Sequence, residues 1–240
     1  MLKAAMEKML DLAKVEVIEV GVRKFTSRKV EEVKPFTIDP ITVHSLRAVV
    51  DFFKGELKQN RDVDTGNVLI HIVDPYTVKV VSGAADQTYR NREHYLTAKC
   101  IHDEFDFGKY HDQEQMIIKL MTLFVQDEKT AVIRDVISRL TVRSDVELED
   151  DGVSQDVTVR KTNRRGDEKI TIENPMTLRP IRTFTEVDQV SAPYVLRVKD
   201  MSGIPNVAIF DASADHWKND AITNIRQFLE KELPGVKILG

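Results

Sequence analysis

The sequence predicts an α+β protein with mixed and antiparallel sheets, about five helices and a long projecting β-hairpin arm. Three observations lead to this class. Several segments carry apolar residues at helical spacing, and from residue 141 onward apolar and polar residues alternate as in half-buried strands. Hydrophobic residues make up 42% of the 240 residues and charged residues 31%, so the chain can bury a core beneath a strongly ionised surface.

The N-terminal part of the chain is expected to form two pieces outside the core. Residues 1–14 have the pattern of a short amphipathic helix and lack the unbroken apolar run of a signal peptide. Residues 15–37 are rich in β-branched and charged residues and predict a two-stranded arm whose turn lies at residues 26–29. Because an isolated hairpin is only marginally stable in water, this arm is expected to need a partner surface.

Residues 38–240 are assigned to one α+β core, which is expected to begin with a helix over residues 40–58. Asp39 followed by Pro40 is typical of a helix start, since the carboxylate can accept from free backbone donors and proline needs no hydrogen bond there. The apolar stripe of this helix consists of Val43, Leu46, Val49, Val50, Phe53 and Leu57.

Strands and helices then follow each other through the middle of the chain. Short apolar runs predict strands at residues 68–72, 77–81 and 95–101, the first two joined at Asp74-Pro75. Residues 112–140 contain two helical patterns, and an aspartate at position 127 is expected to cap the second.

The last hundred residues predict a hairpin meander followed by two strands and a helix. Turn residues at 150–152 and 163–166 divide the alternating segment 141–173 into antiparallel strands. Further strands are expected near residues 194–198 and 207–210. A closing helix is expected to start at Asp215 as its cap, with a buried stripe that begins at Trp217.

Charge and cysteine content indicate in which cellular compartment the protein works and which kinds of partner it can attract. The formal net charge is −4 with both signs interleaved, so no global field draws the chain to nucleic acid or to anionic lipid. The single cysteine, Cys100, cannot form an internal disulfide, which suits the reducing cytoplasm. No run approaches the roughly 20 apolar residues of a membrane span. We therefore expect a cytoplasmic protein without a membrane partner.

The sequence predicts no catalytic, cofactor or metal site, and hence a protein that is not an enzyme. His94, His102 and His111 lie among several acidic residues, but their spacing matches neither an H-E-x-x-H helix nor a zinc finger. Cys100 and His102 share a strand face without any known nucleophile signature around them. Glycine-rich phosphate loops and G-x-S-x-G elbows are also missing from the sequence.

Two basic clusters are the candidate contact sites for phosphate groups or for neighbouring subunits. Basic hairpins can straddle a phosphate backbone, although aromatic residues that would stack on bases are not interleaved with either cluster. The first cluster lies near the tip of the arm and the second on a hairpin of the meander: Arg23, Lys24, Arg28 and Lys29, and Arg160, Lys161, Arg164 and Arg165.

Several ordered blocks of sequence carry a resemblance to a known family. They include residues 110–114, 150–155, 174–184, 208–212 and 217–229. Together they resemble the YfdQ-like phage and prophage proteins, a family of unknown function, over about residues 40–233. The resemblance implies a phage-encoded protein in the host cell cytoplasm and transfers no catalytic residue.

The order of elements also resembles the capsid-like shell fold of phage heads and encapsulins, in which such an arm reaches over a neighbouring subunit. The leading functional hypothesis is therefore a non-enzymatic phage protein that self-assembles into a homo-oligomer such as a shell or a ring. One alternative is an accessory DNA-binding protein in phage DNA metabolism or recombination. Another is a counter-defence protein that sequesters a host nucleotide signal or a host factor.

Overall fold

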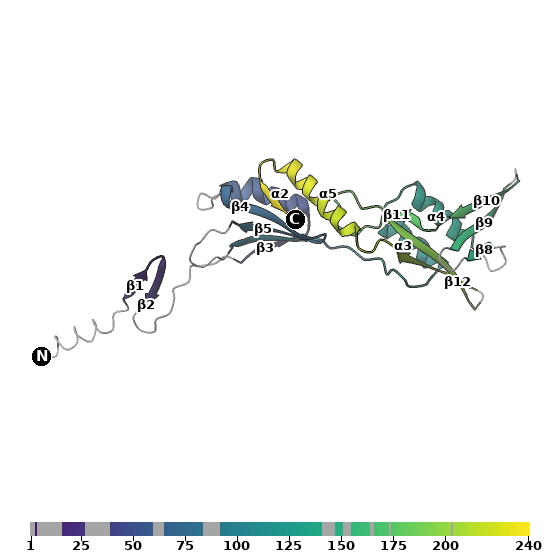
Figure 1. Cartoon of the computed structure of the whole chain (residues 1–240), viewed down its shortest axis with the longest axis horizontal. Coiled ribbons are helices and arrows are strands. Elements are labelled where there is room, and N and C mark those ends of the chain that lie inside the picture. The colour runs from purple at the N-terminus through teal and green to yellow at the C-terminus, as the bar shows by residue number, and fades with distance from the viewer. Residues whose placement is uncertain are drawn as a thin grey trace.

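The computed structural model describes Lys3 and residues 16–26, 39–59, 65–83, 92–140, 147–150, 155–163, 166–172, 174–202 and 204–240. These residues form two lobes, arranged one after the other along an elongated molecule, and a small hairpin that lies apart from both (Figure 1). The α+β class with mixed and antiparallel sheets is confirmed.

The first lobe is built on a five-stranded mixed sheet with the order β14-β4-β5-β6-β3. The three central strands are antiparallel neighbours and match the three strands predicted in the middle of the chain. The two outer strands join them in parallel and were not predicted, since each has only three residues. The bounds are β3 Ile41–Val43, β4 Val68–Asp74, β5 Thr77–Ser82, β6 His94–Lys99 and β14 Lys237–Leu239.

The first helix of the core starts later than the sequence predicts. Helix α2 (Leu46–Phe52) begins at Ser45, whose Oγ accepts from the Ala48 N–H at 3.1 Å, and continues as a π-helical turn, η1 (Phe53–Leu57). The prediction of a helix start at Asp39-Pro40 is wrong. The β-branched residues that follow form β3, because pairing with β6 satisfies their backbone groups in a sheet. A short 3-10 turn, η2 (Thr65–Asn67), precedes β4.

The closing helix α5 (Trp217–Glu232) lies with α2 on one face of the five-stranded sheet (Figure 1). The predicted buried stripe is confirmed, because Trp217, Ala221, Ile225 and Leu229 are all buried. The predicted cap is wrong. The N-cap position is held by His216 without a side-chain cap, and the preceding aspartate bonds instead to a lysine of the first helical turn.

The second lobe combines an antiparallel sheet, ordered β11-β12-β13-β7, with two helices. One predicted cap and two predicted strands are confirmed in this lobe. Asp127 accepts from the Thr130 N–H at 2.9 Å, and the two longest strands of the sheet cover the segments predicted near residues 194–198 and 207–210. The bounds are β7 His111–Asp112, α3 Gln113–Leu123, α4 Glu128–Ser138, β11 Met176–Leu178, β12 Ala192–Met201 and β13 Ile204–Asp211.

The predicted meander is present as a three-stranded antiparallel sheet, ordered β10-β9-β8, at the far end of the second lobe (Figure 1). Its strands are β8 Glu147–Asp150, β9 Gln155–Asn163 and β10 Gly166–Ile172. The described residues contain four α-helices, and the predicted helix over residues 1–14 lies outside them except for Lys3. No described helix is long and apolar enough to cross a bilayer.

The arm appears in the described residues as a short hairpin of β1 (Val17–Val20) and β2 (Arg23–Thr26). Its turn lies at Gly21-Val22, and Thr26, where the predicted turn was to begin, belongs to β2; the rest of that predicted turn, residues 27–29, lies outside the described residues. Gly21 has φ +65°, a left-handed conformation that glycine adopts without steric cost and that tight hairpin turns require. The remainder of the predicted arm, residues 27–37, lies outside the described residues.

The buried apolar residues form two clusters, one in each lobe, and helix α5 contributes to both. Trp217 and Ala221 belong to the cluster of the second lobe, whereas Ile225 and Leu229 belong to that of the first. The chain between β11 and β12 also returns to the first lobe, where Phe184 is buried. Helix α5 and this return segment therefore hold the two lobes together.

Candidate functional site

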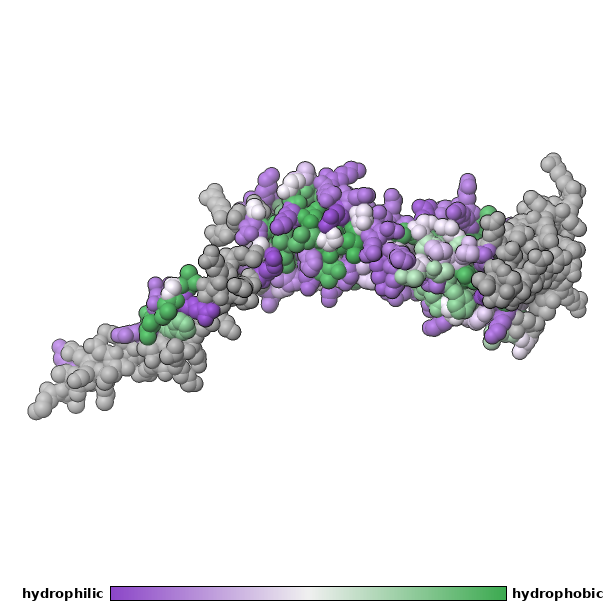
Figure 2. Space-filling view, in the orientation of Figure 1, coloured by the Kyte–Doolittle hydropathy of each residue, from purple (hydrophilic) through white to green (hydrophobic). Residues whose placement is uncertain are grey.

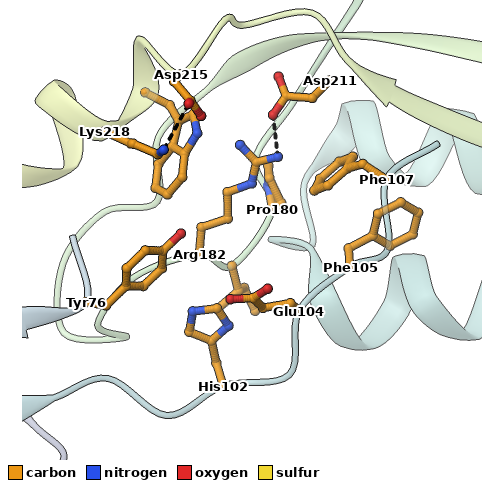
Figure 3. Close-up of a pocket in the computed structure, with 12 residues that line it drawn as sticks. Tyr76, His102, Glu104, Phe105, Phe107, Pro180, Arg182, Asp211, Asp215 and Lys218 are labelled. Atoms are coloured by element: carbon orange, nitrogen blue, oxygen red, sulfur yellow. Dashed lines mark hydrogen bonds and ion pairs between the residues drawn. The ribbon is translucent and has the colours of Figure 1, made fainter. Parts of the chain in front are cut away.

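A cavity of about 200 Å³ lies at the junction of the two lobes (Figure 3). Its lining comes from the β4–β5 turn, from residues 102–107, from residues 180–182 and from residues 211–218 around the start of α5. Ligand sites are common at such junctions between packed units. We call this cavity the junction pocket.

Arg182 lies at the centre of the junction pocket, on a segment whose backbone is held in place by hydrogen bonds. Before it, Pro180 forms a bridge with Phe124, and the Ile181 N–H donates to the carbonyl oxygen of Leu123 at 2.8 Å. The Arg182 N–H itself donates to the side-chain oxygen of Gln189 at 2.9 Å. The guanidinium therefore enters the pocket from a well-anchored segment.

Aromatic rings surround the guanidinium group of Arg182 (Figure 3). Its central carbon lies 4.3 Å from the ring centroid of Phe107, 4.8 Å from that of Trp217 and 5.5 Å from that of Tyr194. Such contacts stabilise a cation through the negative faces of the rings, and more strongly where water is excluded. The Arg182 side chain is only 13% exposed, so this stacking is largely dry.

A carboxylate completes the environment of the guanidinium. Arg182 Nη2 donates to Asp211 Oδ2 at 2.6 Å, and the backbone N–H and hydroxyl of Ser213 donate to Asp211 Oδ1 at 2.8 and 2.5 Å. Burial by itself raises the pKa of Asp211, but the Ser213 and Arg182 donors outweigh it and hold that pKa below its ordinary value of 3.8. Arg182 Nη1 and Tyr194 Oη are buried without a hydrogen-bond partner among the described residues.

The rim of the junction pocket carries further polar groups. Lys218 Nζ lies 2.9 Å from Asp215 Oδ2, and this pair is largely exposed. Tyr76 faces the pocket from the β4–β5 turn, and burial, followed by the negative charge of Glu104, raises the pKa of its hydroxyl. His102 completes this side, with its ring centroid 6.1 Å from that of Tyr76. The pocket thus combines aromatic walls with charges of both signs.

The turn that leads into α5 is strained, because Ala214 and Asp215 have φ +47° and +65°. A left-handed conformation costs a non-glycine residue roughly 1–2 kcal/mol, and glycine avoids this cost at the expense of some chain entropy. We expect Ala214→Gly to raise the free energy of unfolding by about 0.5–1 kcal/mol in urea denaturation. Ala212→Gly, at a position without a positive φ, is expected to lower it, and equal losses in both variants would contradict the strain.

The predicted basic clusters do not contribute to the junction pocket. Arg23 and Lys24 are neighbours in β2 and therefore face opposite sides of the hairpin, and Lys24 Nζ lies 3.0 Å from Glu19 Oε1. Arg160 and Lys161 lie in β9, paired in register with Lys169 and Glu168 of β10. The remaining four predicted residues, Arg28, Lys29, Arg164 and Arg165, lie outside the described residues.

Two members of the acidic and histidine-rich segment meet in the structure. His111 Nε2 and Lys119 Nζ each lie 2.9 Å from Asp106 Oδ1. Partial burial raises the pKa of Asp106, but the hydrogen bond from Lys119 and the other partners lower it to about 2. Within the described part of the chain, no group of three His, Cys, Asp or Glu side chains could hold a metal ion.

Cys100 lies close to His102 in sequence and is a half-buried thiol. Burial, assisted by the negative charge of Glu186, raises the pKa of Cys100 to about 11. The thiolate that a nucleophile requires is therefore scarce at neutral pH. His102 Nδ1 contacts the backbone oxygen of Asp103 at 3.1 Å.

Sequence reasoning missed the junction pocket. Arg182 stands in an extended segment between prolines, and no local pattern indicates that it meets Phe107 or Trp217, which lie 75 and 35 positions away from it. The only local signal was the buried stripe of the closing helix, which placed Trp217 in the interior.

Comparison of the chain with protein-family models, with curated proteins and with solved structures gives no match. The junction pocket and the β1–β2 hairpin therefore carry the functional argument.

Proposed function

We propose that the protein is non-enzymatic and self-assembles into a homo-oligomer through its β1–β2 hairpin. The observation that carries this proposal is the exposure of four apolar side chains on ten residues: Val17 is 56% exposed, Ile18 47%, Val20 62% and Val22 71%. Figure 2 shows these hydrophobic groups on the hairpin, away from both lobes. Exposed apolar groups that lie together in this way are typical of interaction surfaces.

The hairpin is amphipathic, which indicates which of its faces meets the partner. Ile18 lies opposite Phe25 and Val20 lies opposite Arg23, so these four side chains share one face, which we call the apolar face. The other face carries Val17 together with the ion pair between Glu19 and Lys24.

A second copy of the chain is the partner that we propose for the apolar face. Two strands without a core are only marginally stable, so the hairpin requires a covering surface. The lobes of its own chain lie apart from it in the described structure (Figure 1). An arm that reaches over a neighbour is also what the capsid-like order of elements implies. We therefore propose a closed assembly, a shell or a ring, for a phage-encoded protein in the host cytoplasm.

The described part of the hairpin does not favour the DNA-binding alternative. A surface that follows a phosphate backbone needs cations on one side, whereas Arg23 and Lys24 point to opposite sides and Glu16 and Glu19 lie close to them in sequence. The composition of this hairpin therefore suits apolar contact with another protein better than contact with phosphate groups.

The test is the mass of the full chain measured by size-exclusion chromatography with light scattering. We expect a homo-oligomer at micromolar concentration and a lower mass for the double variant Ile18→Glu/Val20→Glu. Each apolar side chain removed from an interface costs about 1.5–3 kcal/mol, so the pair weakens assembly by about a hundredfold or more. Val17→Glu places a single such charge on the opposite face and is the control for the face that is changed.

Three outcomes decide the proposal. A lower mass for the double variant only, with unchanged circular dichroism and melting, supports assembly through the apolar face. A monodisperse monomer of the unmodified chain at micromolar concentration removes the proposal. An equal mass in all variants assigns the hairpin to some other role. Electron micrographs of the unmodified oligomer then separate a shell from a ring.

A further inference from the structure

We propose that the junction pocket binds a small organic cation, an alkylguanidinium or alkylammonium group. The charge balance of the lining, its aromatic walls and the size of the cavity lead to this ligand class. The inference concerns a site far from the β1–β2 hairpin and stands independently of assembly.

The charge balance of the junction pocket favours a cation. Two of its three carboxylates already have partners, since Arg182 lies 2.6 Å from Asp211 and Lys218 lies 2.9 Å from Asp215. Glu104 is the third; it is exposed at the rim of the pocket and forms no salt bridge among the described residues. Its carboxylate points into the pocket beside His102 (Figure 3). One added positive charge would balance this group, whereas an added anion would place a second negative charge beside it.

The aromatic walls suit the same ligand. Tyr76 contacts Trp217 edge to face at a centroid distance of 6.2 Å and contacts His102 at 6.1 Å, so three rings line one side of the cavity. The faces of aromatic rings attract ammonium and guanidinium groups. The pocket already holds one such group, because the Arg182 guanidinium lies 4.8 Å from the Trp217 ring. A ligand cation would meet the same chemistry beside Glu104.

The size of the cavity favours a small cation over the nucleotide that the counter-defence alternative requires. The volume is about 200 Å³, whereas pockets for drug-sized ligands measure roughly 300–1,000 Å³. A nucleotide would also bring phosphate charge next to Glu104, which has no salt-bridge partner among the described residues. A side-chain-sized cation fits the volume and the charge together.

The single tryptophan of the chain, Trp217, lines the pocket and reports occupancy directly. The experiment titrates the full chain with agmatine at constant ionic strength and follows tryptophan fluorescence, with sodium chloride as the blank. We expect a saturable change for the unmodified protein. Glu104→Gln is expected to weaken agmatine binding at least tenfold, because it removes the unpaired charge. The matched control is Asp103→Asn, at an exposed carboxylate of the same segment outside the pocket lining.

Two further titrations identify the source of the ligand and the sign of its charge. A short peptide with one arginine is titrated in the same way. Binding of this peptide indicates that the natural ligand is an arginine side chain of a partner protein, whereas binding of agmatine alone indicates a free small molecule. Inorganic phosphate tests the opposite charge. The proposal is overturned if agmatine gives no saturable change up to about 10 mM, a limit that corresponds to negligible affinity. It is also overturned if both variants bind agmatine equally, or if phosphate saturates the signal instead.

Discussion

Replacing Trp217 by alanine is expected to lower the free energy of unfolding by about 3–5 kcal/mol, the usual cost of truncating a buried tryptophan. The side chain is only 5% exposed and belongs to the apolar cluster of the second lobe, although its helix packs on the sheet of the first. It also forms one wall around the Arg182 guanidinium. The substitution therefore removes packing, a cation–π contact and part of the connection between the lobes.

Urea or thermal denaturation followed by circular dichroism measures this effect. For a chain of this length, 3–5 kcal/mol corresponds to a fall in melting temperature of about 10 °C. Trp217→Phe keeps most of the packing and is expected to lose less than half as much. Lys218→Ala, one residue further on and 43% exposed on its side chain, should change stability by no more than about 0.5 kcal/mol. A melting temperature that Trp217→Ala leaves unchanged would place the indole outside the core.

Replacing Asp211 by alanine is the second large change, with an expected loss of about 2 kcal/mol. The reason is the charge that remains: Arg182 is 13% exposed and would be left without its carboxylate in a largely dry site. Asp211 is 26% exposed on its side chain, so water screens part of this cost, and the loss stays below the roughly 3–5 kcal/mol of a fully buried pair. Asp215→Ala breaks an exposed ion pair in the same pocket and should cost no more than about 1 kcal/mol.

The same pair predicts how stability depends on pH. The pKa of Asp211 in the folded protein lies below its ordinary value of 3.8, so folding favours the ionised carboxylate. Its contribution is present above pH 4 and is lost as the pH falls through the lowered folded-state value. We therefore expect the stability difference between the unmodified protein and Asp211→Asn to be largest at neutral pH and to shrink in acid. A difference that does not change between pH 7 and pH 3 would show that the carboxylate is not preferentially ionised in the fold.

Periodicity in the sequence predicted the elements that carry their own signal over many residues. Helix α5 has a buried stripe at helical spacing, and its buried residues match the predicted ones. The helix that Asp127 caps and the hairpins of β4–β5 and β9–β10 were also predicted, because alternating apolar residues and turn residues lie next to each other in the chain. Such elements depend on neighbouring residues, so a single sequence contains the information.

Two predictions were wrong where a local pattern did not decide the structure. Asp39-Pro40 is a sound helix start, yet the chain forms β3 first and starts the helix at Ser45. The turn of the arm was predicted at residues 26–29, yet the described hairpin turns at Gly21. In the first case a distant strand, β6, decided the outcome, because pairing with it satisfies backbone groups that the local pattern assigned to a helix.

The sequence by itself determined the α+β class, most helices and hairpins, and the burial of Trp217, because these follow from the spacing of apolar residues within one segment. Only the tertiary structure decided that the second lobe is inserted between β6 and α5, and that Arg182, Asp211 and Glu104 meet in one pocket. These residues come from segments up to 107 positions apart. Their meeting depends on how two lobes pack against each other, and the spacing of residues within a segment carries no record of that packing.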